Sequence, residues 1–138
     1  MPVPYEKQIL IIDDSPESIE LVSCILKRSD FMIRIAKNAN SALKLIQFQI
    51  PHIILLDVNM PEMNGFEVCK RLKEQEQWRQ IPIIFISALG DAKAKLEAFE
   101  AGGVDYVTKP FGIMELLSRI RSVMRRSGSQ EKRSEERR

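Results

Sequence analysis

The sequence predicts an α/β fold in which five parallel strands alternate with five helices, and two observations carry this prediction. Short runs rich in Ile, Val and Leu, typical of buried strands, recur along the chain at residues 8–13, 31–36, 52–57, 82–87 and 104–109. The stretch after each run carries apolar residues at the three- and four-residue spacing of an amphipathic helix. This strict alternation with short, right-handed connections favours a three-layer sandwich, written (βα)5.

The predicted strands differ in how they are covered. The runs that begin at Gln8, His52 and Pro82 are almost continuously apolar, which is typical of central parallel strands with both faces buried. The run at 31–36 alternates around Arg34 and suits a sheet edge. We therefore expect a parallel five-stranded sheet in the flavodoxin-like order 2-1-3-4-5.

The helices are predicted from caps and spacing. The first begins with Ser15 as N-cap and Pro16 at its first position. The fourth is marked by Leu96 and Phe99 and ends before the glycine pair at 102–103. The other helices carry apolar residues at helical spacing: Ile19, Val22, Ile25 and Leu26; then Ala39, Leu43 and Ile46; then Phe66, Cys69 and Leu72; and last Ile113, Leu116, Leu117, Ile120, Val123 and Met124.

We expect one domain over residues 1–126 and a charged, disordered tail or linker over 127–138. A chain of 138 residues with 44% hydrophobic residues can build one substantial core. The tail mixes both charges and has no aromatic residue for base stacking, so we do not expect direct nucleic-acid binding. It contains no apolar residue for a second core, yet it could begin a linker to an output domain, and the sequence leaves this open.

Two features bear on the location of the protein. No apolar run approaches the ~20 residues that span a bilayer. The first residues, MPVPYEK, lack the apolar stretch of a secretory signal. We therefore expect a cytoplasmic protein without membrane contact.

Polar side chains stand where four predicted strands end. Asp13 and Asp14 close the first strand and Asp57 closes the third, while Ser87 closes the fourth and Lys109 closes the fifth. In an open parallel sheet, ligands bind outside the carboxyl ends of the strands. Crowded carboxylates repel one another unless a cation compensates them, and an all-oxygen site suits a hard cation such as Mg²⁺. A lysine and a hydroxyl beside it can stabilise a transferred phosphoryl group.

Four sequence blocks resemble the response-regulator receiver family of two-component signal transduction: IIDDS, LLDVNMPEMNGFEV, IIFISAL and DYVTKPF. The resemblance covers roughly residues 7–126. It implies a role for each site residue: Asp57 as phosphoacceptor; Asp13, Asp14, Asp57 and the Asn59 backbone carbonyl as ligands of Mg²⁺, with Mn²⁺ as an alternative ion; Ser87 as switch hydroxyl; Lys109 as phosphate contact; Tyr106 as switch aromatic; and a cis peptide bond between Lys109 and Pro110.

The resemblance also implies a function. The chain is expected to be a phosphoacceptor switch and not an enzyme, beyond self-phosphorylation from small donors and autodephosphorylation. A sensor histidine kinase or a histidine phosphotransfer protein supplies the phosphoryl group, because the single histidine, His52, begins a buried strand. Phosphate then pulls Ser87 inward and Tyr106 rotates toward the core. This changes the face of the fourth helix, fifth strand and fifth helix, which controls an effector, an output domain or a homodimer.

Other readings remain open at this point. Leu89 lies two positions beyond Ser87, where the resemblance implies control of hydrolytic water, and its apolar side chain indicates moderately slow hydrolysis. A magnesium-dependent phosphatase of haloacid dehalogenase type needs a second acid where this chain has Asn59. A flavin module needs a glycine-rich phosphate cradle where the chain has DDSPES. A pseudo-receiver that acts without phosphorylation is the remaining alternative.

Overall fold

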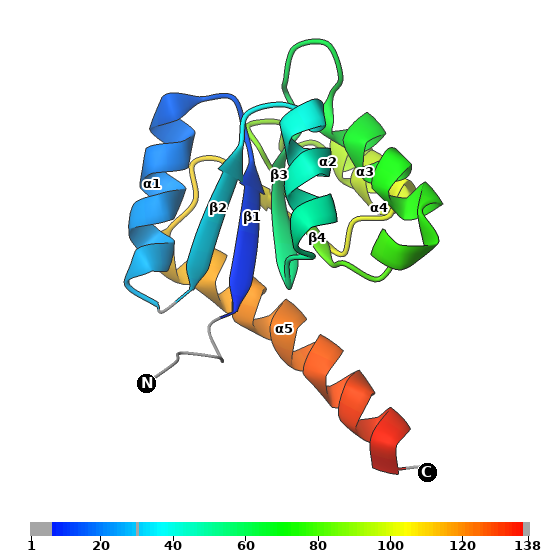
Figure 1. Cartoon of the computed structure of the whole chain (residues 1–138). Helices are drawn as coiled ribbons and strands as arrows, with labels where there is room; N and C mark the ends of the chain where they lie inside the picture. Colours follow the sequence, from blue (N-terminus) through cyan, green and yellow to red (C-terminus); the bar gives the residue numbers. More distant parts are fainter. Residues whose placement is uncertain (1–6, 30, 137–138) are drawn as a thin grey trace.

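The computed structural model describes residues 7–29 and 31–136, and strands alternate with helices along them (Figure 1). The sheet is parallel throughout and has the strand order β2-β1-β3-β4-β5, which confirms the predicted fold. The elements are β1 (Gln8–Ile12), α1 (Pro16–Lys27), β2 (Met32–Ala36), α2 (Ala39–Phe48), β3 (Ile53–Asp57), α3 (Gly65–Glu74), the 3-10 helix η1 (Glu76–Trp78), β4 (Ile83–Ser87), α4 (Ala92–Ala101), β5 (Asp105–Thr108) and α5 (Ile113–Glu136).

Side-chain caps start the helices that follow β1 to β4. The Ser15 hydroxyl accepts a hydrogen bond from the Ser18 amide at the start of α1, as the sequence predicts. Asn38, Asn64 and Asp91 do the same for α2, α3 and α4, at 2.8, 3.0 and 2.7 Å. Each cap satisfies a backbone donor that the helix leaves unpaired and thereby stabilises the start of its helix.

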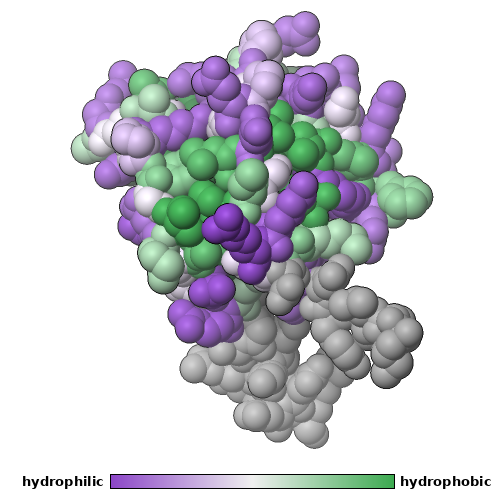
Figure 2. All heavy atoms as spheres, turned by 90° about the vertical axis from the view of Figure 1, so that its left-hand side faces the viewer, coloured by the Kyte–Doolittle hydropathy of each residue, from purple (hydrophilic) through white to green (hydrophobic). Residues whose placement is uncertain are grey.

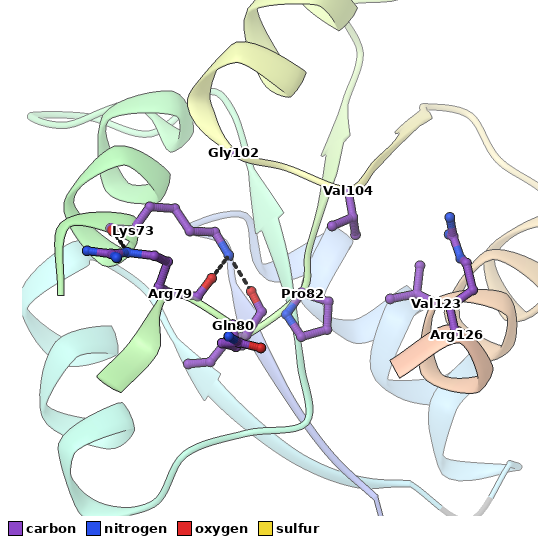
Figure 3. A pocket seen from close by; sticks show the side chains of 9 residues that line it. Lys73, Arg79, Gln80, Pro82, Gly102, Val104, Val123 and Arg126 are labelled. Atoms are coloured by element: carbon purple, nitrogen blue, oxygen red, sulfur yellow. Dashed lines mark hydrogen bonds between the residues drawn. The ribbon is translucent and has the colours of Figure 1, made fainter. Parts of the chain in front are cut away.

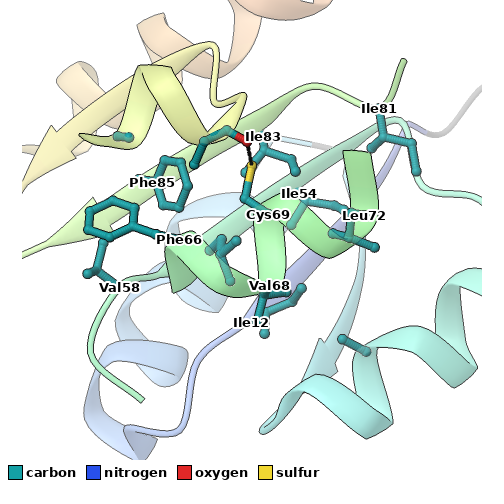
Figure 4. Packing of buried hydrophobic residues seen from close by; sticks show 14 of the residues in the cluster. Ile12, Ile54, Val58, Phe66, Val68, Cys69, Leu72, Ile81, Ile83 and Phe85 are labelled. Carbon is teal, nitrogen blue, oxygen red and sulfur yellow. Dashed lines mark hydrogen bonds between the residues drawn. The ribbon is translucent and has the colours of Figure 1, made fainter. Parts of the chain in front are cut away.

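The core lies on both faces of the sheet. Helices α1 and α5 cover one face and α2, α3 and α4 cover the other (Figure 1). On the second face the rings of Phe66 and Phe85 pack with centroids 5.2 Å apart, and the Cys69 thiol donates a hydrogen bond to the Ala101 carbonyl (Figure 4). Every residue of β3 and β4 is buried, which explains their continuous apolar runs.

Helix α4 is confirmed, but the two residues that mark it in the sequence do not form its buried face. Leu96 and Phe99 are 60% and 52% exposed. The helix instead buries Ala94, Ala98 and Ala101 against the sheet. Small side chains let the helix approach the sheet closely, and its larger apolar residues therefore face solvent.

Strand β2 forms an edge, as its alternating pattern predicts. Arg34 fixes α2 beside it, since its guanidinium donates hydrogen bonds to the carbonyls of Leu45 and Gln49, at 2.9 and 2.6 Å. His52 differs from expectation: β3 begins one residue later, His52 is exposed, and its Nδ1 accepts a hydrogen bond from the Gln8 amide. The imidazole thus joins the starts of β1 and β3.

Helix α5 continues beyond the predicted domain boundary. Its backbone is helical from Ile113 to Glu136, so residues 127–136 extend the helix away from the sheet (Figure 1). Residues 137 and 138 lie outside the described residues. The division into a domain over 1–126 and a tail over 127–138 stays a prediction. No helix among the described residues combines the length and the apolar character needed to cross a membrane.

Candidate functional site

The polar residues that close the strands meet at one edge of the sheet, the upper edge in Figure 1. Asp57 and Ser87 are the last residues of β3 and β4, and Asp13 and Lys109 follow β1 and β5. Backbone hydrogen bonds hold the two flanking residues in place: the Asp13 amide donates to Ala36 at 3.0 Å and the Lys109 amide to Ser87 at 2.7 Å. The structure therefore confirms that these separate segments converge at one edge of the sheet, as predicted.

Three carboxylates form the centre of the site. Asp13, Asp14 and Asp57 each place one oxygen within 4.8 Å of the others. Asp13 and Asp57 are only 3% and 6% exposed. One oxygen of Asp13 accepts a hydrogen bond from the Ser15 amide at 2.9 Å. Such a set of carboxylate oxygens, two of them from buried acids, fits a hard divalent cation like Mg²⁺, because a cation compensates the repulsion among the three.

Lys109 completes the arrangement of charge. Its Nζ lies 3.9 Å from Oδ2 of Asp13 and 3.9 Å from Oδ1 of Asp57. The Lys109–Pro110 peptide bond is cis, as predicted. The ammonium thus stands between the two most buried acids and faces the space where a phosphoryl group on Asp57 would lie.

The environment of Asp57 opposes its ionisation. Burial raises the pKa of the Asp57 carboxyl to about 6, and the negative charge of Asp13 adds to this increase. The positive charge of Lys109 and a hydrogen bond with the Asn59 backbone lower the pKa again, though less strongly. At neutral pH the Asp57 carboxyl is ionised in an environment that favours neutralisation of its charge.

Gly65 lets α3 begin directly beside this acid. Its amide donates a hydrogen bond to the Val58 carbonyl at 2.8 Å, and a Cβ on Gly65 would lie 2.3 Å from the carbonyl oxygen of Asp57. Glu62, in the same loop, has a φ of 70°. In the sequence, Gly65 stood out only as part of the block LLDVNMPEMNGFEV, and its close packing against Asp57 becomes visible in the structure.

A chain of contacts leads from the site to Tyr106. Ser87 is fully buried, and its Oγ accepts a hydrogen bond from the Leu89 amide at 3.1 Å. The Tyr106 hydroxyl donates to the Leu89 carbonyl at 2.5 Å, and its ring lies in the core, 6.4 Å from Phe85. This is the inward position that we expected after phosphorylation. The rotation itself stays a prediction.

Asn59, the remaining predicted ligand, is exposed in the loop after β3. Its backbone hydrogen-bonds the Asp57 carboxylate, which lowers the pKa of that group. Asn59 therefore lies at the site, and its role as a ligand remains a prediction.

Comparison with known proteins identifies the family. A family model described as the response regulator receiver domain matches residues 9–121. The chain belongs to this family. It is 39% identical over 87% of its length to the DNA-binding dual master transcriptional regulator RpaA of Synechocystis, and 38% identical over 88% to the phosphate regulon transcriptional regulatory protein PhoB of Pseudomonas aeruginosa. The matched region spans only 50% and 53% of these relatives.

A solved receiver has the same fold. The chemotaxis protein CheY4 of Vibrio cholerae superimposes with a TM-score of 0.81 at 30% identity, over 86% of this chain and 98% of that one. Receiver domains are phosphoacceptor switches of two-component systems; they bind Mg²⁺ at an acidic pocket and interact with histidine kinases and output effectors. The predicted family and fold are thus confirmed, and Asp13, Asp14 and Asp57 form an acidic cluster of the kind that receiver domains use.

Proposed function

We propose that this receiver domain accepts a phosphoryl group on Asp57 from a histidine kinase or a histidine phosphotransfer protein. The main support for this proposal is the environment of the buried Asp57 carboxylate. Asp57 has two further acids within 4.8 Å and an ammonium at 3.9 Å. Three crowded acids would only destabilise a purely structural domain, whereas a site for a cation and a phosphoryl group needs them.

The transfer follows from the positions of the side chains. An Asp57 oxygen forms the new bond to phosphorus while the bond from phosphorus to the donor nitrogen breaks. Lys109 offsets the negative charge on the transferring oxygens, and the Ser87 hydroxyl donates a hydrogen bond to one of them. The acceptor is an anion before the transfer because its pKa of about 6 lies below neutral pH.

The same residues would hold a magnesium ion. Asp13, Asp14 and Asp57 supply carboxylate oxygens and the Asn59 carbonyl supplies a further ligand. The ion would neutralise phosphate charge and orient the transferring group, and Mn²⁺, which also prefers oxygen ligands, is an alternative.

Output is proposed to pass through the face formed by α4, β5 and α5. Leu96 and Phe99 are exposed on α4, and Arg119 of α5 pairs with Asp105 of β5 at 3.0 Å. Tyr106 lies in the same strand, so a movement of its ring alters this face directly. The effector is a protein, a linked output domain or a second copy of the chain.

Removing the hydroxyl of Tyr106 should weaken its contact with Leu89, which links the site to the face formed by α4, β5 and α5. In Tyr106→Phe the Leu89 carbonyl loses its donor, and we expect a loss of about 1 kcal/mol in the free energy of unfolding. Urea unfolding measures this, while phosphorylation of Asp57 should persist. Unchanged stability would show that solvent replaces the bond at no cost.

A partner that delivers phosphate can dock on the surface between α1 and α5. Apolar residues gather in the middle of this face and hydrophilic residues surround them (Figure 2). They include Leu21 and Ile113, which line a hollow of about 410 Å³. The hollow is lined by residues from the middle and the end of α1 and from the first turns of α5.

The decisive experiment measures intact mass. Purified protein is incubated with Mg²⁺ and acetyl phosphate, and wild type is compared with Asp57→Ala. We expect a phosphoryl-sized mass gain that requires Mg²⁺ and is absent from the variant. No gain under any condition would leave the fold unchanged but identify the chain as an interaction module that acts without phosphorylation. Rapid turnover of the donor without accumulation of the phosphorylated mass would indicate a phosphatase instead.

Leu89 is expected to limit hydrolysis of the aspartyl phosphate. Its side chain is apolar and 42% exposed beside the site, where it cannot orient an attacking water. Leu89→Gln should therefore shorten the lifetime of the phosphoryl group several-fold. The decay of the phosphorylated mass after donor removal measures this, with Leu96→Gln on α4 as the matched control. Equal lifetimes, or a wild-type half-life of seconds, would contradict the role.

A further inference from the structure

A pocket lies at the end of the sheet opposite to Asp57. Its volume is about 350 Å³, at the lower limit of ordinary small-molecule sites. The last turn of α3, the segment leading into β4, the turn between α4 and β5, and α5 surround it (Figure 3). Because the strands are parallel, residues that precede β4 and β5 are separated from the phosphoacceptor by the full length of the sheet.

The charged residues that line the pocket are all cations. They are Lys73, Arg79 and Arg126, and no carboxylate joins them in the lining. Among the side chains of residues 7–29 and 31–126, the ion pairs involve Lys109 and Arg119 only, so these three cations have no acidic partner there. The pocket thus concentrates positive charge that the described part of the chain does not neutralise.

Lys73 is held in a fixed position in the pocket wall. Its Nζ donates hydrogen bonds to the carbonyls of Arg79 and Ile81, at 2.9 and 2.6 Å (Figure 3). An ammonium has three donors, so one remains for a ligand. Gly102 makes room for this side chain, since a Cβ there would lie 2.9 Å from Cγ of Lys73. Burial lowers the pKa of Lys73, and a bound anion would favour its charged form.

The opposite wall is apolar and ends in a second cation. Val104 and Val123 line it together with Pro82, and Arg126 of α5 stands beside them (Figure 3). We propose that this pocket binds a small organic phosphate, with the phosphate between Lys73 and Arg126 and the apolar part against Pro82 and Val104. A phosphate dianion gains more from several cations than a carboxylate monoanion does. Guanidinium groups also match the geometry of phosphate oxygens.

The proposal is independent of phosphorylation on Asp57 and is tested on the full chain without Mg²⁺. Phenyl phosphate, inorganic phosphate and phenol are titrated separately while backbone amide shifts are followed by NMR. We expect saturable shifts at Gln80, Gly102 and Val104 with phenyl phosphate, weaker binding of inorganic phosphate and no response to phenol. Stronger binding of inorganic phosphate would overturn the apolar part of the proposal, and no saturable shift at these amides would overturn all of it.

Variants that remove one positive charge distinguish binding in this pocket from non-specific electrostatic attraction of phosphate. Arg126→Gln should weaken phenyl phosphate binding about tenfold, because it removes one charge-assisted contact. Arg125→Gln, an exposed neighbour outside the pocket lining, should leave affinity unchanged. Lys73→Met should abolish binding, and Lys109→Met should not affect it. Equal losses in the two arginine variants, or loss in Lys109→Met, would show that the phosphate is attracted elsewhere.

Discussion

Phosphorylation of Asp57 is expected to slow about 100-fold when Lys109 is replaced by methionine. The ammonium lies 3.9 Å from the Asp57 carboxylate and from Asp13, and among the side chains of residues 7–29 and 31–126 it is the only cation paired with these acids. Methionine keeps the length of the side chain but offers no charge to the transferring oxygens. The initial rate of mass gain with acetyl phosphate at saturating Mg²⁺ measures the effect.

The control for this variant is Lys44→Met, which removes an exposed lysine from α2. It should phosphorylate at the wild-type rate. Because Lys109 is partly exposed, its loss should leave the fold intact, which circular dichroism can verify. A rate within threefold of wild type would mean that the metal alone neutralises the phosphoryl charge, and Lys109 would then have no role in transfer.

Sequence reasoning predicted the fold because each strand combines a continuous apolar run with a polar end. Parallel order and short crossovers then leave one place for Asp13, Asp57, Ser87 and Lys109 to meet. The buried face of α4 could not be found in this way. Its core residues are alanines, which carry little hydrophobic signal, whereas the larger Phe99 faces solvent.

The finer features of the site depend on tertiary distances that no local pattern encodes. The close approach of Gly65 to the Asp57 carbonyl and the inward position of Tyr106 are of this kind. So is the raised pKa of Asp57, which results from burial by residues distant in sequence. The pocket around Lys73 was missed because its lining comes from several segments without a shared motif.

Asp57→Asn is expected to stabilise the metal-free protein at neutral pH. Folding raises the pKa of Asp57 from 3.8 to about 6, so the native state holds its proton more tightly than the unfolded state does. Stability from this group is complete below about pH 4 and is lost as the pH rises through about 6. Wild type therefore carries the full cost of ionising Asp57 at neutral pH. Asparagine avoids it, for a gain of about 3 kcal/mol.

Urea unfolding in EDTA at about pH 7 and about pH 4 tests both the size and the sign. The two proteins should differ at the higher pH and nearly converge at the lower one, where Asp57 is protonated in the native state and close to half protonated in the unfolded state. Adding Mg²⁺ should reverse the order, because an ion that binds only the native state stabilises wild type and loses a ligand in the variant. If the variant were less stable than wild type at neutral pH without metal, the attraction between Lys109 and the Asp57 carboxylate would exceed the destabilising effects of burial and Asp13. Folding would then not disfavour the ionised form of Asp57.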